Sequence, residues 1–363
     1  MRALFVAVFL VSRQLVVAVR PPPEVASRRS FTNLVKETDA WAARISSATE
    51  NKTRCEEIVS ELTAERAVPK KRLDIHTGVI FPHDTFNEKW RDPERKLRLT
   101  PLSFLATQNL GSLKLRFWTT LEPSHPLMEE IFGPILRIPA LARSIQVSKF
   151  DMDREAAKAF PNQNNLSKAL LDAYRSHVDP GSMSDLMRAV ILNNYGGAWV
   201  DSDVLLIRDM APIMAEDWAY FGKPDFVNGA VMSTSRPRSP FMQNYLLAVV
   251  GHGIPMFHER YYQFGPRILT ALKKNAEEAH NTGFFHVLPP CFFDPHFQHT
   301  GRPPPAEIFF AEVASGSDIA SKRPGSTSHA AFAYHWHNGW EFPIRPGSLA
   351  DELEQIYRSL LSM

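Results

Sequence analysis

The chain has 363 residues, 44% of them hydrophobic, which is enough for one large α/β domain with flanking segments. Its 41 Lys and Arg residues against 39 Asp and Glu residues leave a formal net charge of +2, which argues against a nucleic acid or another bulk polyelectrolyte as partner. Two cysteines, Cys55 and Cys291, lack the spacing of a zinc site and either pair as one disulfide or remain free.

The N-terminus has the pattern of a targeting segment. Nine apolar residues run from Ala3 to Val11, and the polar group Ser12–Gln14 interrupts them. Because a spanning helix needs about 20 apolar residues, the short run favours a secretory signal peptide over residues 1–20. A marginal type II signal anchor and a buried N-terminal helix are the alternatives, and the prolines at 21–23 argue against the helix.

The segment 21–72 lacks strong strand signals and is expected to be a stem or linker. Asn51 begins an N-glycosylation acceptor pattern, and so does Asn165 farther along the chain. Both patterns support a secretory route, because this modification occurs on surface loops of secreted proteins.

We expect the catalytic domain to cover residues 73–345 and a C-terminal helix to follow at 346–363. Periodicity predicts a helix over 100–110 and strands at 78–81, 113–119 and 145–150. The polar stretch 152–180 is expected to form a loop over the site.

The stretch from Ser184 to Asp209 holds the strongest pattern. Apolar residues at helical spacing predict a helix over 184–194, and Gly196-Gly197 ends it because glycine tolerates left-handed backbone. A short apolar strand is expected over 198–207, interrupted by Asp201-Ser202-Asp203.

Two carboxylates within an apolar strand are costly unless something pairs with them. At i and i+2 of an extended chain, Asp201 and Asp203 would point to the same side and form a site for a hard cation, Mn²⁺ or Mg²⁺. The alternative is a strand end whose acids cap a helix or pair with arginines.

The segment SDLMRAVILNNYGGAWVDSDV (184–204) resembles the donor site of metal-dependent glycosyltransferases that carry a DXD motif. It is most similar to the α-1,4-galactosyltransferases, α-1,4-N-acetylglucosaminyltransferases and yeast-type initiating mannosyltransferases. Trp199 stands where that family usually has Tyr, so an aromatic ring is kept and a hydroxyl is lost. The resemblance implies a GT-A-like nucleotide-sugar-binding fold of the α/β class, with a mixed, mostly parallel sheet flanked by helices.

Later segments follow in the family's order. Strands are predicted at 218–223 and 226–233, and Asn228 in the second resembles a sugar-contacting, catalytic residue, with an ordinary Asn-Gly turn as the alternative. A helix is predicted at 241–250. The segments GPRILT (265–270), VLPPCFFDP (287–295) and His335-Trp336 with Trp340 resemble the family's last motifs.

The resemblance also implies roles for individual residues. Asp203 and His335 would coordinate Mn²⁺ or Mg²⁺, and Asp201 would reach the metal or the ribose. The implied donor-binding set is Asp185, Arg188, Gly196, Gly197, Trp199 and Asp201, and His83 and Asp84 are expected near the uridine. A neutral imidazole is a competent Mn²⁺ ligand; simple packing among aromatic residues is the alternative for His335 and is favoured for His337.

The function that follows is a retaining glycosyltransferase that moves a hexose or N-acetylhexosamine from a nucleotide sugar, expected to be a UDP-sugar, to a glycan or glycolipid acceptor. The family resides in the Golgi lumen, so membrane contact is expected only through an uncleaved N-terminal segment. Two alternatives remain open. One is a haloacid-dehalogenase-type phosphatase, which also places Asp-x-Asp after an apolar strand, and the other is an inactive, secreted carbohydrate-binding relative.

Overall fold

The computed structural model describes residues 55, 57–58, 72–81, 87–176, 180–223, 226–252, 263–278, 285–294, 309–311 and 331–363. The predicted targeting segment, most of the predicted stem, His83 and Asp84, and the acceptor pattern at Asn51 lie outside these residues. Within the described part of the chain, no helix has the length and apolar character needed to cross a membrane.

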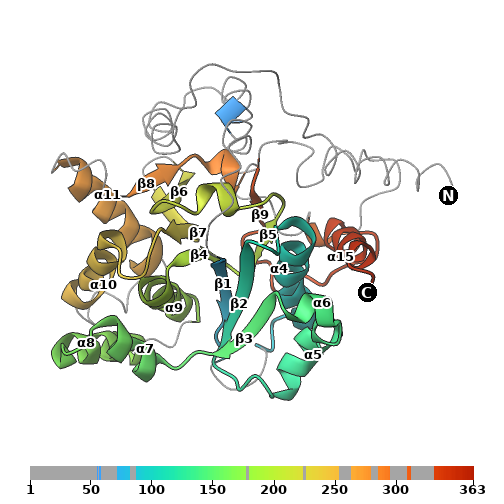
Figure 1. Cartoon of the computed structure of the whole chain (residues 1–363), viewed down its shortest axis with the longest axis horizontal. Helices are drawn as coiled ribbons and strands as arrows, with labels where there is room; N and C mark the ends of the chain where they lie inside the picture. The colour runs from blue at the N-terminus through green and yellow to red at the C-terminus, as the bar shows by residue number, and fades with distance from the viewer. Residues whose placement is uncertain are drawn as a thin grey trace.

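A seven-stranded mixed sheet lies at the centre of the domain, in the order β3-β2-β1-β4-β7-β6-β8 (Figure 1). Four neighbouring pairs are parallel, whereas β7 runs antiparallel to both β4 and β6. The predicted mixed, mostly parallel α/β sheet is therefore confirmed. The strands are β1 (Leu73–Val79), β2 (Leu113–Thr119), β3 (Ile145–Lys149), β4 (Gly197–Val200), β6 (Trp218–Lys223), β7 (Phe226–Thr234) and β8 (His286–Leu288).

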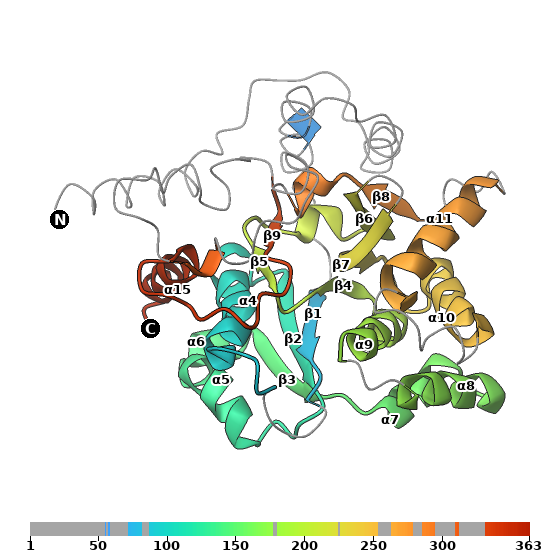
Figure 2. The same ribbon diagram turned by 180° about the vertical axis from the view of Figure 1, so that it is seen from behind.

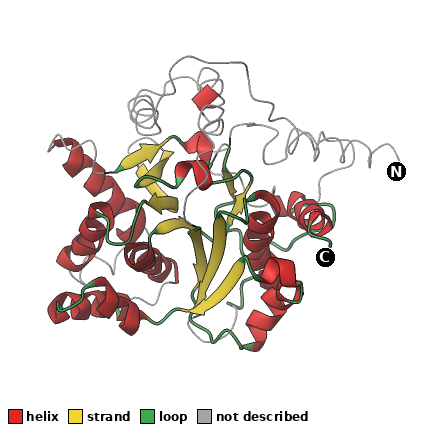
Figure 3. Ribbon diagram, in the orientation of Figure 1, coloured by secondary structure: helices red, strands yellow, loops and turns green. Residues whose placement is uncertain are grey.

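Helices flank the sheet on two sides (Figure 3), and the view from behind shows the same two groups (Figure 2). One group contains α4 (Pro93–Thr107), α5 (Pro126–Leu136), α6 (Pro139–Ala142) and α15 (Leu349–Leu360). The other contains α7 (Met152–Ala159), α8 (Asn164–Arg175), α9 (Pro180–Tyr195), α10 (Pro240–His252) and α11 (Ile268–Glu278).

Side chains alternate across the sheet, so each face has its own apolar core. On β4, Ala198 and Val200 pack into the cluster that contains Phe132 of α5, whereas Trp199 packs into the cluster that contains Leu186 of α9. Both faces are buried, which is why the central strands read as nearly continuous apolar runs.

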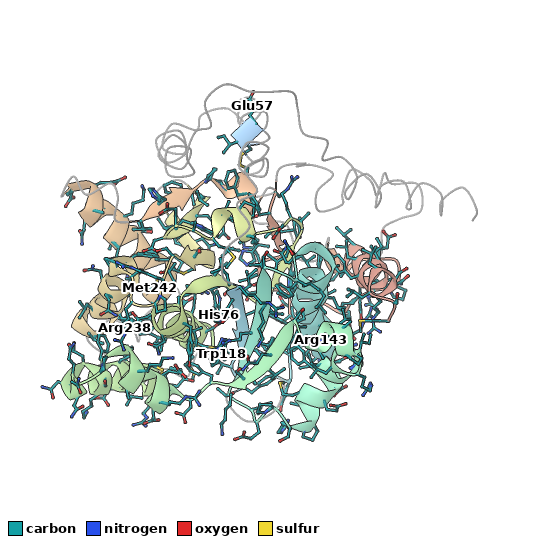
Figure 4. The ribbon with its side chains drawn as sticks, viewed as in Figure 1. Glu57, His76, Trp118, Arg143, Arg238 and Met242 are labelled. Atoms are coloured by element: carbon teal, nitrogen blue, oxygen red, sulfur yellow. A yellow bond between two sulfur atoms is a disulfide. The ribbon has the colours of Figure 1, made fainter. Side chains whose placement is uncertain are left out.

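The first strand begins earlier than the apolar run at 78–81 predicted. It starts at Leu73 and includes His76, a polar residue that is fully buried. The imidazole accepts a hydrogen bond from the Trp118 indole (3.1 Å) and donates one to the Gly196 carbonyl (2.9 Å), so its polar atoms are satisfied (Figure 4). Burial lowers its pKa to about 4, which keeps the ring neutral.

The prediction of a loop over 152–180 was wrong, because this stretch forms α7 and α8. Both helices are amphipathic: Ala156 and Leu170 face the core, while most of their polar residues face solvent, with the buried Glu155 as an exception. Asp151 caps α7 by accepting a hydrogen bond from the Arg154 amide. Asn165, the second acceptor pattern, is exposed in the first turn of α8.

The strand expected over 198–207 is divided between two sheets. After β4, residues 201–203 form a turn, and β5 (Val204–Leu206) pairs with β9 (Ala333–His335) in a separate two-stranded sheet. Asp201 and Asp203 therefore lie in a turn and not on one face of an extended strand, as we had expected. The apolar pattern continues because both short strands are buried.

Cys55 and Cys291 form a disulfide, which decides between the two alternatives that the sequence left open. Cys291 belongs to η4 (Pro290–Phe292), a short helical turn just after β8. The bond joins positions 236 residues apart and ties residue 55 to the segment that follows β8.

Candidate donor and metal site

Most of the predicted site residues gather where β4 ends. Asp201 follows the last residue of that strand, and the amide of Val204 closes the turn by donating to the Asp201 carbonyl (3.1 Å). The Asp201 amide donates to the carbonyl of Ala230 on β7 (2.7 Å). In open α/β sheets, ligands bind outside the carboxyl ends of the strands, and this turn occupies that position.

Asp203 and His335 are brought together although they lie 132 residues apart in the sequence. Val204 of β5 pairs with His335 of β9, so Asp203, in the turn just before β5, lies next to His335. His335 Nε2 lies 3.2 Å from Asp203 Oδ2, and the same oxygen accepts a hydrogen bond from the Asn338 amide (2.6 Å). Both side chains are less than one-tenth exposed.

Charge stabilises this pair in the metal-free protein. Burial would raise the pKa of Asp203, but the imidazolium of His335 and the hydrogen bonds from His335 and Asn338 outweigh burial and lower that pKa to about 2. Burial would lower the pKa of His335, but Asp203 outweighs it and the net shift is upward. A divalent cation bound here would replace the imidazolium proton, as expected for a histidine ligand.

Asp294 and His337 form a second pair next to the first. His337 Nε2 lies 2.5 Å from Asp294 Oδ2, and the rings of His335 and His337 stack with centroids 3.9 Å apart. Nδ1 of His335 lies 3.3 Å from the hydroxyl of Tyr220. Sequence reasoning did not single out Asp294 or Tyr220. The only signal for Asp294 is an acid within the apolar segment Phe-Phe-Asp-Pro.

Arg188 connects two of the predicted carboxylates. Its Nη2 donates to both oxygens of Asp201 (2.7 and 2.9 Å), and its Nη1 lies 3.1 Å from Asp185 Oδ1, one helical turn earlier on α9. The guanidinium side chain is only 4% exposed. Burial opposes its charge, but the two carboxylates raise its pKa above the ordinary value. Burial raises the pKa of Asp201 despite Arg188.

Two glycines allow neighbouring segments to approach these charged groups. A Cβ on Gly229 would lie 2.5 Å from Arg188 Nη1, and a Cβ on Gly265 would lie 2.6 Å from Asp185 Oδ2. Gly229 lies on β7, and Gly265 lies in the helical turn η3 (Gln263–Arg267) that leads into α11. The Asn-Gly-Ala and Gly-Pro-Arg segments of the sequence therefore both pack on the Asp185–Arg188 pair.

Gly196 and Gly197 lie at the opposite end of β4 from Asp201, which does not fit the donor contact we expected of them. Both have left-handed φ angles, 69° and 87°, and a Cβ on Gly197 would lie 2.2 Å from the carbonyl oxygen of Asp74. They are needed for the turn from α9 into β4 and for its close approach to β1.

Trp199 is fully buried, so its ring faces the core of the domain. Its indole Nε1 donates to Asp201 Oδ1, which makes it a support for that carboxylate. Asn228 lies near the start of β7, and its Oδ1 accepts a hydrogen bond from the Ala230 amide (2.9 Å). It is half-buried at the same edge of the sheet as Asp201.

Residues 139–219 match the family model of the glycosyltransferase sugar-binding region containing a DXD motif. The match runs from α6 to the start of β6 and includes Arg188, Asp201 and Asp203. It supports the expectation of a glycosyltransferase with a DXD motif, and it favours this enzyme class over the phosphatase alternative. A comparison with curated proteins finds no match to the sequence.

Several solved glycosyltransferases show weak structural likeness. Mouse xyloside xylosyltransferase 1 is 14% identical over 72% of this chain and 97% of its own, with a TM-score of 0.40. The galactosyltransferase LgtC, solved with donor and acceptor sugar analogs, is 11% identical over 80% and 95% of the two chains (TM-score 0.36). The UDP-bound glycosyltransferase domain of the YGT toxin is 9% identical over 60% and 79% (TM-score 0.38). At these TM-scores we draw nothing further from the likenesses.

Proposed function

We propose that this protein is a metal-dependent, retaining glycosyltransferase that moves a hexose or N-acetylhexosamine from a UDP-sugar to a glycan or glycolipid in α-linkage. The observation that carries the proposal is the buried Asp203–His335 pair at the carboxyl end of β4, beside a segment that matches a DXD region. Carboxylate and imidazole together form a ligand set that suits Mn²⁺.

The residues fit a divalent cation and a nucleoside diphosphate. Asp203 and His335 would hold the cation, Mn²⁺ or Mg²⁺, and Asp201 would face the ribose or reach the cation through water. When bound, the cation stabilises the negative charge that develops on the departing diphosphate. Asp185 and Arg188 would orient the donor sugar, and Asn228 would contact it from β7. Because Arg188 is clamped between two carboxylates, its position is set before a donor arrives.

We further propose that the protein acts in the lumen of the secretory pathway, as a Golgi resident. The Cys55–Cys291 disulfide supports this location, because disulfides persist in oxidising compartments and are rare in the cytosol. The targeting pattern of residues 1–20 and the exposed acceptor pattern at Asn165 agree with it. Expression in animal cells followed by glycosidase digestion and cell-surface or Golgi staining tests the location.

Slow donor hydrolysis tests the enzymatic activity. The purified full-length chain is incubated with a panel of nucleotide sugars, with Mn²⁺ or with chelator, and release of nucleoside diphosphate is measured. We expect metal-dependent release from one UDP-sugar and its loss in Asp203→Asn. Asp153→Asn is the matched control, because it alters an exposed carboxylate on α7 outside the candidate site. This variant should still release nucleoside diphosphate.

The same assay separates the enzyme from an inactive carbohydrate-binding relative. An inactive relative would release nothing from any donor and would bind glycans equally well with and without chelator. Absence of both donor hydrolysis and a thermal shift with UDP and Mn²⁺ would contradict the proposed donor site.

A further inference from the structure

The candidate metal site contains two pairs of an aspartate and a histidine. Asp203 contacts His335, and Asp294 contacts His337. The potential ligand atoms of Asp294, His335 and His337 all lie within 4.8 Å of one another. Atoms that bind one ion at about 2.1 Å lie up to about 4.2 Å apart, so these side chains need to move by less than about 1 Å to share a cation.

The backbone around His337 is held in an unusual conformation that builds this arrangement. His337, Asn338 and Gly339 are three successive residues with left-handed φ angles of 55°, 69° and 67°. Non-glycine residues rarely adopt this region, and such outliers concentrate at functional sites. Here the turn folds the His337 ring onto that of His335 and aims the Asn338 amide at Asp203 Oδ2.

Lys96 of α4 holds the end of the same turn. Its ammonium group donates to the carbonyls of Gly339 (2.7 Å), Trp340 (3.1 Å) and Phe342 (2.5 Å), and its side chain is fully buried. The strained turn is therefore fixed from both ends, by β9 before it and by Lys96 after it.

Resting on the proposed function, we propose that Asp294 and His337 are direct ligands of the same cation as Asp203 and His335. The site then contains two imidazole nitrogens and two carboxylates, and the two negative charges equal the charge of one divalent ion. The bonds now made between each acid and its imidazole are replaced by bonds to the ion.

The hydrogen bonds that Asp201 already accepts support this choice of ligands. Both oxygens of Asp201 accept hydrogen bonds from Arg188, and Oδ1 also accepts a hydrogen bond from the Trp199 indole. A cation at Asp201 would have to displace a guanidinium 2.7 Å away. Asp294 contacts the imidazole of His337, which is itself a potential ligand.

The proposal has a consequence for the choice of metal. Imidazole nitrogen suits Mn²⁺ and later transition metals, whereas Mg²⁺ prefers oxygen ligands and keeps its waters. A site with two imidazoles should bind Mn²⁺ at least about tenfold more tightly than Mg²⁺, and loss of one imidazole should narrow that ratio.

Pulsed electron paramagnetic resonance of Mn²⁺ bound to the full chain counts the coordinating nitrogens directly. We expect two ¹⁴N couplings in the wild type and one each in His337→Gln and His335→Gln. Calorimetry should show at least about tenfold weaker Mn²⁺ binding for Asp294→Asn and His337→Gln. His125→Gln, which changes a histidine that caps α5, and Asp153→Asn are matched controls and should bind Mn²⁺ within about twofold of the wild type.

The outcomes separate this inference from the proposed function. A single ¹⁴N coupling in the wild type that disappears in His335→Gln would overturn the role of His337 and leave the glycosyltransferase assignment intact. Wild-type protein that neither binds Mn²⁺ nor hydrolyses a nucleotide sugar would overturn both. The nitrogen count of the wild type needs no variant, so a variant that fails to fold does not prevent the test.

Discussion

The indole of Trp199 donates a hydrogen bond from Nε1 to Oδ1 of Asp201 over 2.5 Å. Trp199 is buried on the α9 side of β4, and Asp201 lies just beyond the end of that strand. The family that the segment resembles usually has Tyr at this position, so Trp199 lacks the hydroxyl group that a Tyr would offer. In this chain the indole N–H supplies a donor, and it points at the first acid of the DXD motif.

Trp199→Phe is expected to lower the free energy of unfolding by about 2–4 kcal/mol, since it removes a hydrogen bond to a charged acceptor and leaves a cavity. The matched control is Trp218→Phe, because that indole is equally buried but donates to the neutral carbonyl of Ile213. Urea denaturation should show the smaller loss for Trp218→Phe, by about 1 kcal/mol. Equal losses would show that the charge of Asp201 contributes nothing to this contact.

Arg188→Met is expected to be among the most damaging substitutions at the site. It leaves Asp185 and Asp201 without their shared cation in a buried place, which costs about 3–5 kcal/mol. Arg137→Met removes an exposed ion pair with Glu129 and should cost less than about 1 kcal/mol. Chemical denaturation of both variants checks the contrast, and a small loss for Arg188→Met would mean that water reaches both acids.

The stability of the metal-free protein should depend on pH through Asp203. Its pKa is depressed to about 2 in the folded state, so its contribution is complete above the unfolded value of about 3.9 and is lost as pH falls toward 2. That contribution is about 2–3 kcal/mol. The raised pKa of His335 acts in the opposite sense: its contribution is complete below about 6.5 and is lost as pH rises through the folded value.

Unfolding measured in chelator, wild type against Asp203→Asn, should therefore show the largest difference between about pH 4 and 6.5, decreasing on both sides. For Asp153→Asn the difference should be small and flat, because that acid is exposed. A difference for Asp203→Asn that persists unchanged at pH 2 would contradict the ion pair.

Reduction of the Cys55–Cys291 bond should lower thermal stability, because the disulfide closes a loop of 236 residues and restricts the unfolded chain. We expect a loss of about 2–5 kcal/mol, measured as a fall in Tm on addition of dithiothreitol. The double variant Cys55→Ser/Cys291→Ser should melt at the reduced protein's temperature with and without reductant. A Tm that does not respond to reductant in the wild type would show that the bond is not formed in solution.

Lys96→Met should destabilise the turn that follows His337. Three carbonyls lose their shared donor, and buried acceptors left unpaired cost about 1–3 kcal/mol each, so we expect a total of about 2–4 kcal/mol after partial relaxation. Lys168→Met, an exposed lysine on α8, is the control and should be nearly neutral. Mn²⁺ affinity measured on the same variants should fall only for Lys96→Met, since that residue fixes the turn carrying His337.

Local patterns in the sequence were sufficient for much of the fold and for part of the site. The alternating run at 113–119 became β2 without change. The double glycine did end the helix before β4, because glycine adopts φ angles of 69° and 87° without steric cost. The polar stretch 152–180 was assigned wrongly because its low apolar content hid two amphipathic helices. The first strand was placed too late because His76 is polar and yet buried.

The sequence by itself determined which residue types were available at the end of β4: an arginine one turn after an aspartate, and two more aspartates after two glycines. Only the tertiary structure decided how they are used. Pairing of β5 with β9 brings His335 to Asp203 across 132 residues, and the left-handed turn after it brings His337 to Asp294. Such contacts depend on the register between distant strands and on backbone angles, which a local pattern does not encode.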